Sequence, residues 1–108
     1  MNTNLPTVLQ TFITATNAAD TEKYLSTFAE TALIDDWGRK FHGISGAESW
    51  NKTDNIGVQM HFDVHGFTQK SETEFVVEIT ASSKRFNGNG ALHFTLNAAH
   101  TKIEILRT

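Results

Sequence analysis

The spacing of the apolar residues changes once along this chain, and that change constrains the fold more than any other feature. In the first third, apolar residues recur at the three- and four-residue spacing of one helix face. The set is Leu5, Val8, Leu9, Phe12 and Ile13. From Val58 onward the period becomes two, as in strands with one buried face. Helices followed by alternating strands predict an α+β fold.

Local signals place the helices. Asn4 and Pro6 suit the cap and first turn of the first helix, and Asp20 suits the cap of a short second helix. Ser45 and Glu48 form the capping-box pattern that predicts the start of a third helix.

The strands follow from the alternation. We expect strands over 32–36 and 40–42, joined by a turn at Trp37-Gly38-Arg39. Four long antiparallel strands come next, with a hairpin turn at Asn87-Gly88-Asn89-Gly90. The first of these strands directs Val58, Met60, Phe62 and Val64 inward. Residues 1–108 are therefore expected to form one domain, a curved antiparallel sheet wrapped around the N-terminal helices.

Composition excludes several classes of function. The chain of 108 residues has no cysteine, so it has no disulfide, thiolate metal site or cysteine nucleophile. The net charge is −3 and the basic residues are scattered, which argues against a nucleic-acid partner. Without a secretory signal pattern or an apolar stretch long enough to span a bilayer, we expect a cytoplasmic protein with no membrane partner. A small apolar molecule suits this balance better.

His61, Asp63 and His65 share one face of a predicted strand, a spacing that suits a site with two histidines and one carboxylate. The apolar residues of the same strand occupy the opposite face, which places the three on the outside of the sheet. We therefore predict neither a metal nor another cofactor.

Four segments resemble a known family: Asn17-Ala18-Ala19-Asp20, residues 24–29, the strand 32–36, and Phe41-His42-Gly43. The chain resembles the nuclear transport factor 2-like superfamily, and within it the SnoaL-like and ketosteroid isomerase-like proteins. The resemblance implies a cystatin-like cone with a pocket open at one end, and a homodimer formed through the outer sheet face. It does not choose a function, because the family includes isomerases, cyclases, dehydratases and non-catalytic binding modules.

The resemblance aligns Asp36 with the strand-end base of the family's isomerases. It aligns Phe12 and Leu92 with the tyrosine and the acid that stabilise the enolate in those enzymes. Because each lost oxyanion donor costs about a hundred- to a thousandfold in rate, a steroid isomerase proper is not expected.

Two interpretations of Asp36 remain open: a general base in an apolar pocket, or an ordinary turn aspartate. Trp37 either stacks on a ligand or closes the end of the core, and Tyr24 either lines the pocket or packs a helix. The predicted ligand-binding residues are Phe12, Tyr24, Phe28, Trp37, Trp50, Met60, Phe62, Leu92 and Phe94. The functional hypothesis is a cofactor-free proton-transfer enzyme of the isomerase, cyclase or dehydratase type, with Asp36 as acid or base. The alternatives are a binding module or a dimeric scaffold.

Overall fold

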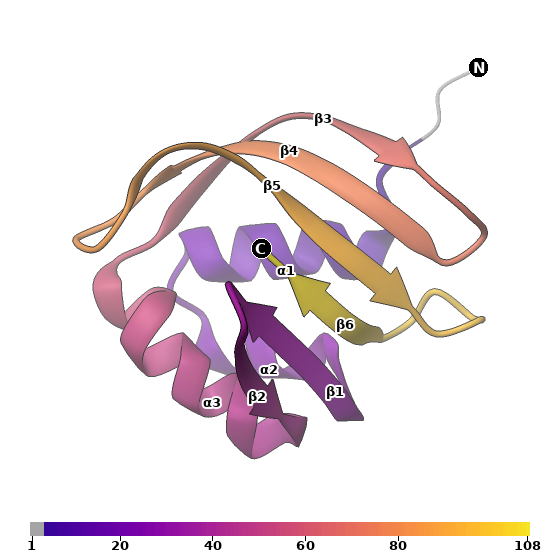
Figure 1. The fold of residues 1–108 in the computed structure, drawn as a ribbon, viewed down its shortest axis with the longest axis horizontal. Coiled ribbons are helices and arrows are strands. Elements are labelled where there is room, and N and C mark those ends of the chain that lie inside the picture. The colour runs from indigo at the N-terminus through magenta and orange to yellow at the C-terminus, as the bar shows by residue number, and fades with distance from the viewer. Residues whose placement is uncertain (1–3) are drawn as a thin grey trace.

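The computed structural model describes residues 4–108, which form three α-helices, one short 3-10 helix and a six-stranded sheet (Figure 1). The helices are α1 (Thr7–Asn17), α2 (Thr21–Ser26), α3 (Gly43–Asp54) and the 3-10 helix η1 (Ile56–Val58). The strands are β1 (Phe28–Asp36), β2 (Arg39–His42), β3 (His61–Gln69), β4 (Glu74–Ser82), β5 (Asn87–Leu96) and β6 (Ile103–Arg107).

The sheet has the order β2-β1-β6-β5-β4-β3. It bends strongly, so that the long strands β3, β4 and β5 arch over α1 while α3 lies beside β1 and β2 (Figure 1). The α+β class and the curved sheet are thus confirmed. The prediction of four long antiparallel strands is wrong at β6, which has five residues and runs parallel to β1 while pairing antiparallel with β5.

The core lies between the concave face of the sheet and the helices. The predicted period of two holds in β4 and β5, whose inward residues are buried. These are Phe75, Val77, Ile79, Ala81, Leu92, Phe94 and Leu96. Phe12 of α1 lies at the centre, with its ring centroid 5.3 Å from that of Phe94 and 6.2 Å from that of Phe62. The helical stripe and the sheet stripe therefore meet as the two periods predict.

Two predicted helix starts are wrong. Pro6, not Asn4, is the residue before α1, and no side chain caps that helix. Helix α3 begins at Gly43, two residues before the predicted cap Ser45. Gly43 has φ +69°, a conformation that suits glycine and turns the chain directly from β2 into the helix. By contrast, Asp20 caps α2 as predicted, accepting a hydrogen bond from the Lys23 amide at 3.1 Å.

The predicted hairpin turn at residues 87–90 is also wrong, because these residues begin β5 and pair with β4. The turn lies four residues earlier in the chain, at residues 83–86. The Ser83 hydroxyl accepts hydrogen bonds from the Arg85 and Phe86 amides at 3.0 and 2.8 Å, and Asn87 bonds back to the Ser83 backbone. Side chains thus close a turn that an Asn-Gly pair was expected to make.

The inward face of the first long strand differs from the prediction at both ends. Val58 belongs to η1, and β3 begins only at His61. Phe62 is buried, whereas Val64 is 42% exposed on the edge strand. A register irregularity between Val64 and Gly66 then shifts the alternation, so that Phe67 packs against the core.

Candidate functional site

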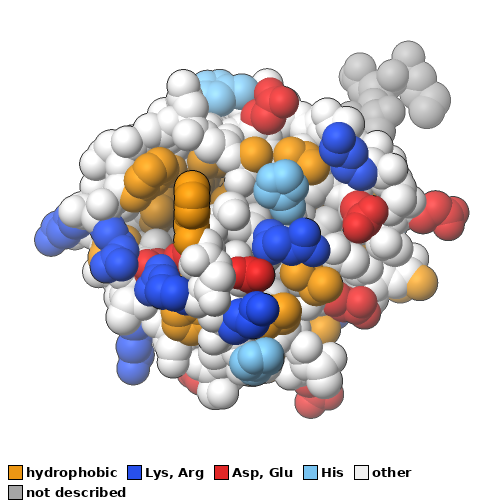
Figure 2. Space-filling model, in the orientation of Figure 1, with side chains coloured by type: hydrophobic (Ala, Val, Ile, Leu, Met, Phe, Trp, Pro, Cys, Tyr) orange, Lys and Arg blue, Asp and Glu red, His pale blue; other side chains and the backbone are white. Residues whose placement is uncertain are grey.

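A pocket of about 450 Å³ opens where the β4–β5 hairpin, α3 and the β1–β2 turn meet. Figure 2 shows hydrophobic side chains around a hollow, with Lys and Arg side chains at its border. The apolar lining consists of Trp37, Trp50, Met60, Phe62, Ala81, Phe86, Ala91 and Leu92. The polar and charged lining consists of Asp36, Arg39, Asp54, Arg85, Asn89 and Thr108, with Gly90 completing the wall.

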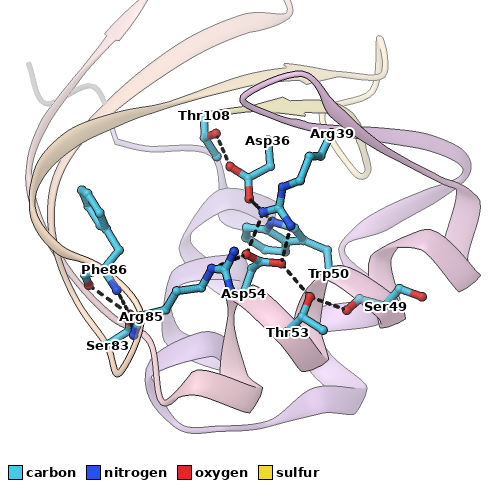
Figure 3. A network of polar contacts seen from close by, with 10 residues as sticks. All are labelled: Asp36, Arg39, Ser49, Trp50, Thr53, Asp54, Ser83, Arg85, Phe86 and Thr108. Atoms are coloured by element: carbon cyan, nitrogen blue, oxygen red, sulfur yellow. Dashed lines mark hydrogen bonds and ion pairs between the residues drawn. The ribbon is translucent and has the colours of Figure 1, made fainter.

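Asp36, the last residue of β1, is the first member of a polar network at one end of the pocket (Figure 3). Its Oδ2 accepts hydrogen bonds from Trp50 Nε1 at 3.0 Å and from Arg39 Nη2 at 2.5 Å. Its Oδ1 accepts one from the Thr108 hydroxyl at 2.8 Å. The side chain is 14% exposed. Both oxygens of the predicted base therefore already have donors.

Asp54, at the end of α3, is the second carboxylate of the network and is 5% exposed. Its Oδ1 lies 2.7 Å from Arg39 Nη2 and 3.0 Å from Arg85 Nε, and its Oδ2 accepts the Thr53 hydroxyl at 2.6 Å (Figure 3). Burial alone would raise the pKa of Asp54. The hydrogen bonds from Arg39 and Thr53 and the two guanidinium charges outweigh it, so the pKa of Asp54 is lowered.

Arg39 joins the two carboxylates. Its hydrogen bond to Asp54, with further contributions from both carboxylate charges, raises the pKa of Arg39 despite some desolvation. With Arg85 included, two guanidinium groups balance two carboxylates, so the network carries no net charge. It fixes the β1–β2 turn, α3 and the β4–β5 hairpin around one end of an apolar pocket.

The sequence pointed to Asp36 and Trp50 but not to the rest of this network. Arg39, Asp54, Arg85 and Thr108 come from four places far apart in the chain. Arg39 and Arg85 stand in the scattered basic pairs Arg39-Lys40 and Lys84-Arg85, which carry no motif. Only the topology brings them together.

The predicted ligand-binding residues divide into two groups. Trp37, Trp50, Met60, Phe62 and Leu92 line the pocket, as does Asp36. Phe12, Tyr24, Phe28 and Phe94 are buried in the core and are not among the lining residues. Ligand binding by any of these residues stays a prediction.

Two interpretations left open by the sequence are decided by position. Trp37 is 88% exposed at the pocket rim, so the interpretation that it closes the core is wrong. Tyr24 packs in the core, where its hydroxyl donates to the Ala47 carbonyl at 2.9 Å and burial raises its pKa.

The histidine-rich face of β3 lies apart from the pocket. His61, Asp63 and His65 are exposed, and the nearest approach of His61 Nδ1 to Asp63 Oδ1 is 3.9 Å. His65 instead bonds the Thr80 hydroxyl. Over residues 4–108, no group of three His, Cys, Asp or Glu side chains is arranged to hold a metal ion. In the same residues, no helix is both long and apolar enough to cross a membrane.

Comparison by sequence finds no matching protein family model and no matching curated protein. Comparison by structure finds solved structures with a similar fold. An NTF2-like protein of unknown function from Cytophaga hutchinsonii matches with a TM-score of 0.77 at 14% identity, over 99% of this chain and 91% of that one. The chain has the nuclear transport factor 2-like (NTF2-like) fold.

Two further solved structures with a similar fold carry other descriptions. A putative polyketide cyclase from Sinorhizobium meliloti has a TM-score of 0.76 at 23% identity, over 95% of this chain and 94% of that one. A Mycobacterium tuberculosis protein in complex with estradiol-17β-hemisuccinate has a TM-score of 0.80 at 17% identity, over 94% of this chain and 88% of that one. At these identities the likeness establishes the fold alone.

Proposed function

We propose that this NTF2-fold chain binds a compact, largely apolar small molecule in the pocket between α3 and the β4–β5 hairpin. The observation that carries the proposal is a pocket of about 450 Å³ with apolar walls and one polar end. That volume lies within the range of about 300–1,000 Å³ typical of small-molecule sites. A few fixed polar groups beside apolar walls are the usual means of orienting such a ligand.

One similar structure supports an apolar ligand. The Mycobacterium tuberculosis protein is in complex with estradiol-17β-hemisuccinate, whose steroid skeleton is largely apolar. The Sinorhizobium meliloti protein is described as a putative polyketide cyclase, which names a class of reaction and no ligand. These descriptions support the class of ligand and not its identity.

The second candidate is a proton-transfer enzyme in which Asp36 is the acid or base. The observation in its favour is that Asp36 lines the pocket and lies beside Trp50. Binding ranks first because both Asp36 oxygens already accept hydrogen bonds, one of them from a guanidinium. Phe12 and Leu92 also offer no oxyanion donor.

The test of binding is a fluorescence titration with anilinonaphthalene sulfonate, a dye with an apolar aromatic body and one sulfonate group. We expect one saturable site. Met60 is half-buried in the pocket wall, so Met60→Trp fills space and should weaken binding by about tenfold or more, a loss of about 1.4 kcal/mol. Val64→Trp, at an exposed position of the edge strand β3 outside the pocket lining, is the matched control and should leave binding unchanged. Unsaturable binding, or equal loss in both variants, would refute the proposal.

Asp36→Asn separates the two candidates. A binding module keeps its dye affinity, because asparagine is close to aspartate in shape and can still accept from Trp50 or Thr108. The enzyme hypothesis requires a substrate turnover that Asp36→Asn abolishes without unfolding the protein. Such a result, with circular dichroism showing an intact fold, would replace binding by catalysis as the main function.

The homodimer and the cytoplasmic location stay predictions. The outer face of the sheet, which would form the dimer, carries the exposed His93 of β5 and Glu78 of β4. Sedimentation velocity over a range of protein concentrations tests the homodimer. A dimer at any of these concentrations supports the prediction, and a monomer throughout refutes it.

A further inference from the structure

The polar end of the pocket has more unused hydrogen-bond donors than unused acceptors. Each carboxylate offers about four acceptor positions. Asp36 accepts three hydrogen bonds, and Asp54 accepts from Arg39 twice and from Thr53 while pairing with Arg85. The side-chain oxygen of Asn89, a further lining acceptor, takes the Thr80 hydroxyl. A ligand group that only donates hydrogen bonds therefore finds few free acceptor positions.

Arg85 has the largest share of unused donors. Its Nε is paired with Asp54 at 3.0 Å, which fixes the guanidinium against α3. Within residues 4–108, its terminal nitrogens Nη1 and Nη2 have no hydrogen-bond partner, and the side chain is 57% exposed at the pocket. One N–H from each of the two terminal nitrogens of a guanidinium can bind one of the two oxygens of a carboxylate. The short turn that carries Arg85 is itself held by Ser83.

The charge of the network does not oppose an acceptor here. The carboxylates of Asp36 and Asp54 are each paired with a guanidinium, so neither leaves an uncompensated negative charge at the site. Arg39 is engaged by both carboxylates, whereas Arg85 is engaged by one. An anion on the side of the Arg85 guanidinium that faces away from Asp54 is therefore closer to the positive charge than to either carboxylate.

We propose that the ligand carries a carboxylate, which Arg85 binds in bidentate fashion through Nη1 and Nη2 while the apolar body of the ligand lies against Phe62 and Leu92. This proposal rests on the proposed binding function and adds the chemical class of the ligand. It also makes Arg85 the residue that distinguishes an acid from its neutral analogues.

The test uses matched pairs of aryl carboxylic acids and their primary amides: phenylbutyric, naphthaleneacetic and biphenylacetic acid. Binding is measured by isothermal titration near neutral pH. We expect the wild type to bind the acid of at least one pair about tenfold more tightly than the amide, which corresponds to about 1.4 kcal/mol. Arg85→Gln should remove that preference, lowering the affinity for the acid about tenfold more than the affinity for the amide. Lys84→Gln, which removes the same charge from the neighbouring exposed residue, should keep the preference.

Three outcomes would overturn the proposal in distinguishable ways. If no member of any pair binds the wild type, the proposed binding function fails with it. If acid and amide bind the wild type equally, the carboxylate subsite fails and the binding function stands. If Arg85→Gln weakens acid and amide alike, Arg85 supports the shape of the pocket and does not recognise the ligand.

Discussion

At the scale of single residues, Trp37 is the most unusual position in the described chain. It has φ +54° and is followed by Gly38 with φ +88°, which makes a two-residue hairpin turn with both φ values positive. Asn or Gly is favoured in the first position of such a turn, and a large side chain in the left-handed region is uncommon. Trp37 gains no burial in return, since it is 88% exposed. A strained residue at a pocket rim is a candidate for ligand contact.

We therefore predict opposite effects of Trp37→Asn on stability and on binding. Asparagine adopts this conformation more easily, so the free energy of unfolding should rise by about 1 kcal/mol. Loss of the exposed ring should weaken binding of anilinonaphthalene sulfonate several-fold. Urea unfolding and dye titration measure the two effects. Trp37→Phe, which keeps an aromatic ring, should change both quantities less. A variant that gains no stability, or binds the dye as the wild type does, would contradict this interpretation.

At the scale of elements, the junction between α1 and β3 positions one wall of the pocket. The Asn17 side chain, at the end of α1, donates to the Phe62 carbonyl at 3.0 Å and accepts from the Phe62 amide at 2.8 Å. The side chain thus takes the place of a neighbouring strand at the start of β3. Phe62 lines the pocket on one side and contacts Phe12 in the core on the other.

Asn17→Ala should lower the free energy of unfolding by about 1–3 kcal/mol, because it removes two part-buried hydrogen bonds and leaves both Phe62 backbone groups unpaired. Urea unfolding monitored by circular dichroism measures this change. Thr7→Ala, at an exposed position of the same helix, is the control and should change stability by no more than about 0.5 kcal/mol. Equal effects of the two substitutions would show that Asn17 does not join the elements.

The elements were largely predictable because each depends on residues close together in the sequence. The stripe from Leu5 to Ile13 and the alternation in β4 and β5 predicted which faces are buried. The errors arose at the ends of elements, where the residues of a turn decided the outcome. Gly43 starts α3 before Ser45, because the end of β2 leads directly into the helix.

The candidate site was predictable only in part, because contacts distant in sequence assemble it. Asp36 followed from a resemblance, and the apolar lining residues Phe62 and Leu92 from the strand period. Asp54, Arg85 and Thr108 belong to no local pattern, since they reach the network only when the sheet closes around α3. Arg39 lies three residues from Asp36, but no sequence pattern indicates that it also pairs with Asp54. Sequence periodicity predicts which side chains face inward, but not which charged groups will pair at the end of a sheet.

At the scale of the whole molecule, the Asp54 network makes stability depend on pH. Asp54 connects α3 to the β1–β2 turn through Arg39 and to the β4–β5 hairpin through Arg85. Because the pKa of Asp54 is lower in the folded protein than in the unfolded chain, its contribution is fully present above the unfolded value of about 3.9. It is lost as the pH falls through the folded pKa.

Asp54→Asn should therefore reduce the free energy of unfolding near neutral pH by about 1–3 kcal/mol, less than the loss of a fully buried pair because both arginines are about half exposed. The difference from the wild type should shrink as the pH falls below about 4 and through the lowered folded pKa of Asp54, because protonated Asp54 is then as uncharged as asparagine. Urea unfolding at several pH values measures it. Asp63→Asn, at an exposed carboxylate on the outer face, should show no such trend. A difference independent of pH would contradict the assignment.

The central claim is that a small molecule occupies the pocket between α3 and the β4–β5 hairpin. Chemical-shift mapping of isotope-labelled protein, titrated with naphthaleneacetic acid, tests it most directly. We predict saturable shifts concentrated on the Trp50 indole and on the amides of Phe62, Phe86 and Leu92, all at the pocket. Shifts confined to the outer sheet face around Thr80 and His93, or no saturable shifts at all, would contradict the account.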